Sequence, residues 1–343
     1  MASLGFHLGL LDDRRRTKAF DRALRETLRP GDVVADLGCG TGILSLLALK
    51  HGASRVYAVE EHPVAELARR VARENGVEGR MIVIRGRSQD VRLPERVDVV
   101  VSELLGDAVL DEEILEVLAD ARRRFLKRGG RLIPSEVLIL ADPVRLPGPA
   151  DWGYGVRLET VRALALHCPR AAPEGCRFGP RRRLWRGRLG RAVRLPLEMR
   201  GRWRGIRADG VRIWFEARLS RSVRLRSLGP GSWSPAFFPA RRPLAGIVDF
   251  RLRYEGGNRF TWSFNGLPAQ GSVLGDEMIL AQLALREDSV PRLPPDRRPF
   301  LEALSRVDGR RTVAQIARAM KGVPYGEAVR RVKTLCLAGG LLW

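Results

Sequence analysis

The 343-residue chain has only four cysteines and four histidines, and they do not cluster along the sequence. Because the cysteines lack C-x-x-C spacing, we expect neither a metal site nor a disulfide framework, and we infer a reducing compartment. No apolar run approaches the roughly 20 residues of a membrane span. The N-terminal apolar run is too short for a signal peptide, and its positive charge follows rather than precedes it. We therefore predict a cytoplasmic protein with no membrane partner and no metal.

Lysine is scarce, yet abundant arginine gives the chain a formal net charge of +22. Such a charge ordinarily raises the expectation of an anionic partner such as nucleic acid. Here the arginines occur in small groups without interleaved aromatic residues or a long basic tail. We interpret the excess of arginine as a general compositional bias, not as a binding surface, and do not expect nucleic acid as a partner.

The first 140 residues alternate short apolar runs with amphipathic segments. Predicted strands cover residues 33–38, 55–59, 81–85, 97–103 and 131–140, and predicted helices cover 41–51, 62–75 and 111–126. Alternation of this kind indicates parallel strands joined by crossover helices. The sequence therefore predicts an α/β, doubly wound Rossmann-like domain.

The remainder of the chain has a different pattern. After about residue 143, apolar and polar residues alternate between glycine, proline and serine, which predicts an antiparallel β-barrel-like domain. Prolines at 289–299 suit a linker, and helical windows follow at 299–307, 312–320 and 324–338. The predicted domains are a cofactor-binding domain at 1–142, a β-barrel-like substrate domain at 143–288 and a small helical, winged-helix-like domain at 289–343.

A glycine-rich turn joins the first predicted strand to the first predicted helix. Its glycines allow a ligand to approach backbone N–H groups at a helix N-terminus, and the acid that ends the next strand can accept hydrogen bonds from ribose hydroxyls. Asp before G-x-G-x-G, in DLGCGTG, is typical of methyltransferases, whereas dinucleotide folds show G-x-G-x-x-G. We therefore predict S-adenosylmethionine as the cofactor and a site that includes Asp36, Gly38, Cys39, Gly40, Gly42 and Glu60.

The first 140 residues resemble the catalytic half of the protein arginine N-methyltransferase family. HLGLLDDRRRT is similar to the family opening H-x-x-M-L-x-D-x-x-R-T. The resemblance implies that His7 and Arg16 contact the cofactor, with Arg16 pairing with its carboxylate, and that Gln89 lies beside the adenine. The alternative is that Arg16 is one solvated member of an arginine run.

The segment SELLGDAVLDE resembles the family loop S-E-W-M-G-(x)5-E, and it places Glu103 and Glu112 at the two glutamates. An enzyme that methylates a guanidinium needs carboxylates that orient and polarise it more than it needs a strong base. Glu112 also suits the first turn of a helix, where the helix dipole stabilises acids. Leu104, Leu105 and Asp107 replace family aromatic and methionine positions and imply a remodelled pocket.

The segment GSWSPAFFP is similar to the family's T-H-W loop and makes Trp233 a third active-site candidate. An ordinary aromatic at the barrel edge is the alternative. Ser232 replaces the family histidine, so we expect the histidine link to Asp13 to be weakened or lost. Only six residues precede His7, and we expect the family's N-terminal aromatic lid helix to be absent.

The resemblance implies methylation of an arginine guanidinium nitrogen in a peptide or protein, and homodimerisation through a reduced arm at 160–185. DGRRTVAQIARAM is similar to small helical domains that capture leader peptides, so the C-terminal domain holds such a peptide or simply covers barrel surface. Methylation of a small-molecule natural product is a second hypothesis. A third is an S-adenosylmethionine-binding regulator with a nucleic-acid-binding tail.

Overall fold

The computed structural model describes residues 4–148, 157–257, 259–267, 270–273, 313–320 and 323–328. The chain divides into two units, residues 1–276 and residues 277–343. All helices and strands named below belong to the first unit, except α9.

Two helices precede the first strand, α1 (Leu4–Asp12) and α2 (Arg14–Thr27). The first sheet and its helices follow as β1 (Val33–Leu37), α3 (Ile43–Lys50), β2 (Arg55–Glu60), α4 (Ala65–Glu74), β3 (Met81–Arg85), β4 (Val97–Ser102), α5 (Ile114–Arg124) and β5 (Leu126–Ile133). The second sheet and its one described helix comprise β6 (Glu136–Arg145), α6 (Glu159–Ala165), β7 (Arg170–Ala171), β8 (Arg177–Phe178), β9 (Arg182–Arg188), β10 (Leu197–Arg218), β11 (Arg224–Arg226), β12 (Ala236–Gly256), β13 (Arg259–Phe264) and β14 (Gln270–Val273).

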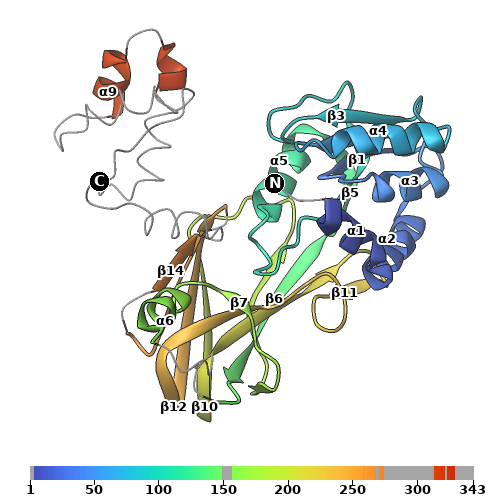
Figure 1. Cartoon of the computed structure of the whole chain (residues 1–343). Helices are drawn as coiled ribbons and strands as arrows, with labels where there is room; N and C mark the ends of the chain where they lie inside the picture. Colours follow the sequence, from blue (N-terminus) through green and yellow to red (C-terminus); the bar gives the residue numbers. More distant parts are fainter. Residues whose placement is uncertain are drawn as a thin grey trace. The chain divides into compact units, whose positions relative to one another are not determined.

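The first sheet is parallel throughout, in the order β3-β2-β1-β4-β5. All five residues of β1 are buried, because this strand lies at the centre of the sheet between β2 and β4. Helices α2 to α5 pack around the sheet (Figure 1). The predicted doubly wound fold is confirmed, and its strand order reverses between β1 and β4, where ligands of such sheets bind.

The strand predicted at 131–140 is wrong as a single element. The structure divides it into the end of β5 and the start of β6, with a cis peptide bond between Ile133 and Pro134. β5 pairs with β4 in the first sheet, whereas β6 pairs with β9 and β10 in the second. Apolar residues on both sides of Pro134 and Ser135 hid this break, because the end of β5 and most of β6 are buried.

The second sheet is antiparallel, and its path among the described residues runs β14-β13-β12-β10-β6-β8. In β12, Val248, Phe250, Leu252 and Tyr254 point inward, while the residues between them carry charge outward. Phe238 contacts Phe250, Phe260 and Trp262 at ring-centroid distances of 6.0, 6.1 and 5.2 Å. The predicted alternation thus builds an aromatic core beneath long strands, which extend away from the first sheet (Figure 1).

The two helices before β1 were not predicted. α2 buries Phe20, Ala23 and Leu24, a helical spacing that the sequence does contain, and Asp13 caps its N-terminus. α1 lacks an amphipathic pattern, since Leu4, Phe6, Leu8 and Leu11 are exposed. Only tertiary context identifies α1 as a helix.

In the second unit, α9 (Val313–Ala319) lies within the helix predicted at 312–320, and residues 325–328 form helix within the window predicted at 324–338. The helix predicted at 299–307 lies outside the described residues. In the part of the chain that the structure describes, no helix has both the length and the apolar composition to cross a membrane.

Candidate active site

A cavity of about 730 Å³ lies at the carboxyl ends of β1, β2 and β4. Its wall combines α1, the glycine turn after β1, the loop after β4 and the loop before β12. The cavity wall includes the predicted residues His7, Arg16, Gly38, Cys39, Gly40, Glu60, Gln89, Glu103, Glu112 and Trp233. The fold therefore brings ten predicted residues to one place.

The glycine turn begins where β1 ends. Gly38 and Gly40 have φ angles of 73° and 53°, a conformation that L side chains rarely adopt. A Cβ atom at Gly38 would lie 2.8 Å from Leu104, and one at Gly40 would lie 3.4 Å from the His7 ring. Backbone conformation therefore favours glycine at both positions, and a side chain at Gly38 would also force Leu104 to move.

Two predicted residues do not line the cavity. Asp36 is fully buried, and its carboxylate accepts a 2.7 Å hydrogen bond from the hydroxyl of Ser45 on α3. Gly42 caps α3 with a φ of 85° and lies against Met81. Both residues support the turn from behind. Their spacing in the motif could not show this, because it does not reveal which way a side chain points.

Glu60 lies at the end of β2 with both carboxylate oxygens held. Oε2 accepts a 3.0 Å hydrogen bond from the N–H of Gly40, and Oε1 accepts one of 2.8 Å from the N–H of His62. The side chain is buried but lines the cavity. Its position is therefore fixed before any ligand arrives.

Arg16 and Glu103 form a buried ion pair across the cavity, which the sequence did not predict. Arg16 Nη2 also donates to the carbonyl of Leu10, at 2.9 Å. Arg16 Nε and His7 Nε2 are buried without a hydrogen-bond partner. Arg16 is thus no solvated member of an arginine run, and two polar atoms on this wall stay available to a ligand.

Asp13 keeps its link to the loop before β12, which corrects the expected loss. Its Oδ2 accepts hydrogen bonds from the N–H and the hydroxyl of Ser232, at 2.8 and 3.0 Å, while Oδ1 accepts the N–H of Arg16. A Cβ at Gly231 would lie 2.6 Å from Oδ2, so glycine allows the close approach. A shorter side chain suffices because the backbone itself comes within hydrogen-bond distance.

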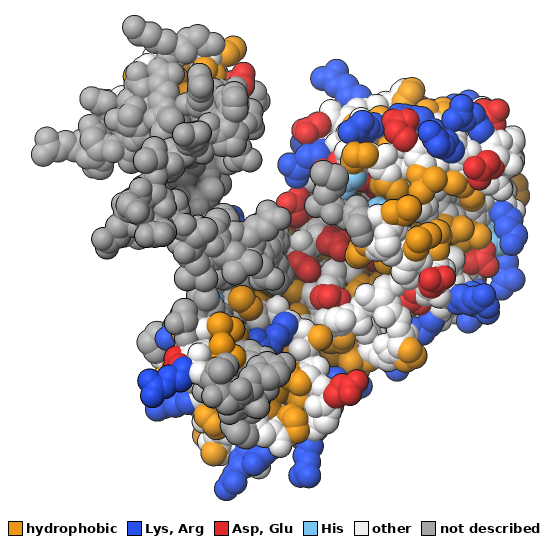
Figure 2. Space-filling model, in the orientation of Figure 1, with side chains coloured by type: hydrophobic (Ala, Val, Ile, Leu, Met, Phe, Trp, Pro, Cys, Tyr) orange, Lys and Arg blue, Asp and Glu red, His pale blue; other side chains and the backbone are white. Residues whose placement is uncertain are grey.

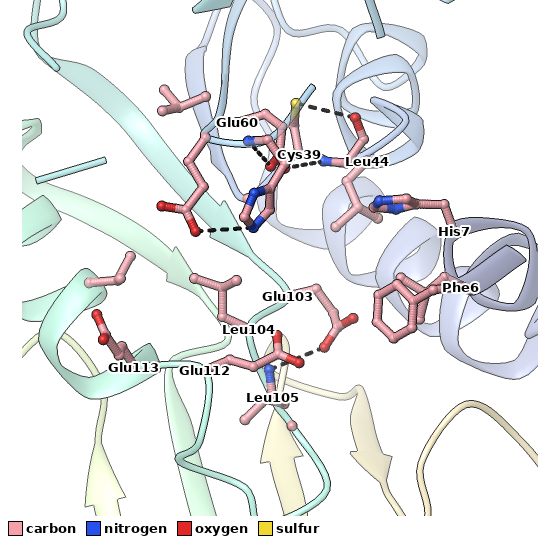
Figure 3. A pocket seen from close by; sticks show the side chains of 18 of the residues that line it. Phe6, His7, Cys39, Leu44, Glu60, Glu103, Leu104, Leu105, Glu112 and Glu113 are labelled. Carbon is pink, nitrogen blue, oxygen red and sulfur yellow. Dashed lines mark hydrogen bonds and ion pairs between the residues drawn. The ribbon is translucent and has the colours of Figure 1, made fainter. Parts of the chain in front are cut away.

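Four carboxylates gather on one side of the cavity: Glu103, Asp107, Asp111 and Glu112. Glu103 and Glu112 lie side by side beneath the glycine turn (Figure 3). Burial raises the pKa of Glu103, although Arg16 opposes this shift. Burial within the wall, and then the charges of Glu103, Asp111 and Asp107, raise the pKa of Glu112 to about 8. Acidic side chains are visible in the hollow of the face in Figure 2, with basic ones around its margin.

The loop that carries these carboxylates has an unusual backbone. Val109 and Glu113 have φ angles of 72° and 60°, and a positive φ is costly for a β-branched residue such as valine. A Cβ at Gly106 would lie 2.4 Å from Asp111 Oδ1, an oxygen that is itself buried without a partner. Asp111 was not predicted as a member of the site, although it precedes Glu112 directly.

Trp233 is buried rather than an edge residue. Its Nε1 donates to the carbonyl of Leu105, and its ring makes an edge-to-face contact with Phe215 at 5.1 Å. The next residue, Ser234, donates its N–H to Asp107 at 2.6 Å. Trp233 and Ser234 therefore hold the carboxylate loop against the second sheet.

The outer wall includes α1, which places Phe6 and His7 beside the cavity (Figure 3). α1 itself contains His7, so the expected absence of an aromatic lid helix upstream of His7 stays a prediction. Gln89 lies in the wall after β3, where its Oε1 accepts a 3.0 Å hydrogen bond from Ser88. Burial raises the pKa of the Cys39 thiol well above its ordinary value, so Cys39 contributes as a neutral group.

The parallel sheet, the glycine turn and the barrel-like second sheet define a Rossmann-like methyltransferase fold with an added antiparallel domain. A sequence model described as "Ribosomal protein L11 methyltransferase (PrmA)" matches residues 16–141. The chain is 38% identical over 176 residues to a probable protein arginine N-methyltransferase 6 of Arabidopsis thaliana, covering 49% of this chain and 40% of that protein. It is 34% identical over 173 residues to protein arginine N-methyltransferase 6 of Danio rerio, covering 47% of this chain and 50% of that protein.

The chain spans about half the length of the curated relatives it matches. Among solved structures, the Trypanosoma brucei PRMT1 enzyme–prozyme heterotetrameric complex with AdoHcy matches with a TM-score of 0.68 and 22% identity, over 79% of this chain and 98% of that one. Arabidopsis thaliana protein arginine methyltransferase 10 matches with a TM-score of 0.65 and 20% identity, over 80% of this chain and 98% of that one. The predicted resemblance and the two-sheet fold are thus confirmed.

Glu112→Gln tests the carboxylate cluster through pH. The folded-state pKa of about 8 lies above the ordinary 4.5, so the folded protein binds the proton more tightly and wild-type stability falls as pH rises between these values. Glutamine mimics the neutral form. We expect the free energy of unfolding of the variant to match that of wild type near pH 5 and to exceed it at pH 9 by about 1 kcal/mol, since solvent in the cavity screens part of the effect. Urea denaturation at three pH values measures this, with exposed Glu74→Gln as control. Equal pH slopes for wild type and Glu112→Gln would contradict the cluster's geometry.

Asp13→Ala tests the link between α2 and the loop before β12. The change removes the N-cap and both bonds from Ser232, so we expect a loss of about 2 kcal/mol. Ser232→Ala retains the N–H bond and should cost only about 0.5–1 kcal/mol. Chemical denaturation gives both values. Equal losses would show that the hydroxyl carries the whole link.

Proposed function

We propose that the chain is an S-adenosylmethionine-dependent methyltransferase that acts on a guanidinium nitrogen of arginine in a peptide or protein. The observation that carries the proposal is the pair Glu103 and Glu112, which lie side by side in a cavity that begins at the glycine turn. A guanidinium presents N–H donors in a planar fork that matches carboxylate oxygens. The similarity to arginine methyltransferases over about half of the chain supports the same acceptor.

The residues of the cavity fit the proposed cofactor. The unpartnered Arg16 Nε supplies a cationic donor for a carboxylate, and the glycine turn supplies close backbone approach. Glu60 lines the wall where ribose hydroxyls require acceptors. His7 and Gln89 complete the polar wall on either side of the turn.

When bound, S-adenosylmethionine supplies a methyl group on a positively charged sulfur. Glu103, held by Arg16 and by the N–H of Leu105 at 3.3 Å, fixes one edge of the guanidinium. Glu112 holds the other edge. The nitrogen that gains a methyl group must lose a proton. With a pKa of about 8, Glu112 is largely protonated at neutral pH in the free protein, so it accepts that proton only after the cationic guanidinium beside it has favoured its carboxylate form. These two groups hold the guanidinium in one orientation, which lowers the entropic part of the activation barrier for methyl transfer.

The similarity to protein arginine methyltransferases favours a peptide or protein substrate over a small molecule. We infer that residues 277–343, a unit of their own, recruit the peptide, for example through a leader segment. Homodimerisation is a further part of the proposal. A solved structure with the same fold is a heterotetrameric complex, which motivates a measurement of mass in solution.

Incubation of the chain with isotope-labelled cofactor and a library of arginine peptides tests the proposal. Tandem mass spectrometry should place the label on a guanidinium nitrogen. Label on another amino acid, or on a small natural product and no peptide, would replace the proposed acceptor.

Glu103→Gln should lower kcat by about 1000-fold, because the neutral amide loses the charge that holds the guanidinium. Cofactor affinity, measured by calorimetry, should change much less than kcat. Glu74→Gln serves as the matched control on the surface of α4. Retained turnover in Glu103→Gln would eliminate the carboxylate-clamp mechanism.

Deletion of residues 290–343 tests recruitment by the second unit. We expect the KM for a long peptide substrate to rise about tenfold, while kcat/KM for a short arginine peptide stays unchanged. Steady-state kinetics on both peptides measures the difference. An unchanged KM for the long peptide would dismiss recruitment and leave the cavity's chemistry intact.

A further inference from the structure

The second sheet carries a hollow of its own, about 750 Å³ in volume, which shares no lining residue with the candidate active site. The end of β6 and residues of β8, β10 and β12 form its wall. Arginines and apolar residues dominate the lining, among them Leu146, Pro147, Pro243 and Leu244. The volume lies within the range of about 300–1,000 Å³ that is usual for small-molecule sites.

Three exposed arginines from three strands face this hollow: Arg145 on β6, Arg177 on β8 and Arg207 on β10. Arg145 and Arg177 are direct partners in the antiparallel register. Like charges directly opposite each other destabilise a sheet pair. The pairing of β6 with β8 therefore places two positive charges side by side, and a bound anion would reduce the repulsion between them.

Other arginines of the same sheet have acidic partners. Arg212 pairs with Asp142 at 2.9 Å, and Arg186 pairs with Glu136 at 2.8 Å. Among the described residues, none of the three arginines of the hollow has a carboxylate within ion-pair distance.

The one acidic residue found in the described lining is Asp209. Its Oδ2 accepts a 2.9 Å hydrogen bond from the N–H of Leu146. This bond fastens the residue after β6 to β10, and among the described residues Asp209 forms no ion pair with the three arginines, so the lining keeps an excess of positive charge. The local charge excess is thus built into three strands, at the end of β6, the start of β8 and the middle of β10.

We propose that this hollow binds a nucleoside polyphosphate. Guanidinium groups form paired hydrogen bonds with phosphate oxygens, and three of them from separate strands match a ligand with several negative charges. The apolar side chains of Leu146, Pro147, Pro243 and Leu244, which lie among the arginines in the same wall, offer a surface for a base. The site is separate from the proposed methyl-transfer chemistry, so either proposal can fail alone.

Calorimetric titration of the full chain with ATP, and separately with inorganic triphosphate, tests the proposal at 0.15 M salt. We expect saturable binding of one ATP at this hollow, weaker binding of triphosphate, and a rise in Tm with each ligand. Equal affinities for ATP and triphosphate would overturn the nucleoside part of the proposal. Absence of saturable binding at millimolar ATP would overturn it entirely.

The double variant Arg145→Gln/Arg177→Gln localises the binding. We expect ATP affinity to fall at least about tenfold, because two charged hydrogen-bonding groups are lost. The free variant should melt no lower than wild type, since it loses a like-charge pair. Should the double variant unfold, Arg207→Gln measures the same contact with one substitution.

The matched control is Arg191→Gln/Arg194→Gln, which removes the same charge from exposed positions before β10 that do not line the hollow. We expect its ATP affinity to stay within about twofold of wild type, as for screened charges at a distance. An equal loss in both double variants would show non-specific attraction to a basic protein and refute the site. Binding of a single-stranded oligonucleotide in preference to ATP, with the same sensitivity to Arg145 and Arg177, would also refute it.

Discussion

The buried ion pair between Arg16 and Glu103 connects the parts of the candidate active site. Arg16 belongs to α2, whose cap Asp13 binds the loop before β12 through Ser232, and Glu103 follows β4 directly. The same loop holds the carboxylate segment through Trp233 and the carbonyl of Leu105. Two charges buried together remain stable only with a partner, so loss of either would leave the other uncompensated. The ion pair joins α2 to the end of β4, and the neighbouring bonds of Asp13 and Trp233 join both to the loop before β12.

This arrangement explains how a strongly basic protein can accept a cationic group. Arg16 neutralises Glu103, but Asp107, Asp111 and Glu112 have no equivalent cation in the described cavity wall, and burial raises the pKa of each. A guanidinium placed among them would relieve repulsion that the empty wall carries. Because the crowded carboxylates repel one another, the wall favours a positively charged ligand over a neutral one.

The sequence predicted the architecture well where physical rules are local. Strand–helix alternation identified the first sheet, the glycine spacing identified the turn, and the similarity of SELLGDAVLDE identified Glu103 and Glu112. It failed where three-dimensional contacts decide: the direction of Asp36, the pairing of Arg16 with Glu103, and the break between β5 and β6. The replacement of histidine by Ser232 could not be evaluated from residue type, because the backbone N–H supplies part of the link.

The placement of charge also changes the interpretation of composition. The arginines that give the net charge of +22 are spread along the whole sequence. In the structure, however, acidic side chains gather at the cavity. Residues 134–273, by contrast, contain 26 arginines, no lysine and 10 acidic residues. Salt screens charges beyond about 8 Å at physiological ionic strength, so a ligand in the cavity responds mainly to the carboxylates around it. The arginines of the second sheet act within their own neighbourhood. Opposite local fields on one chain are therefore compatible, and each can serve a different ligand.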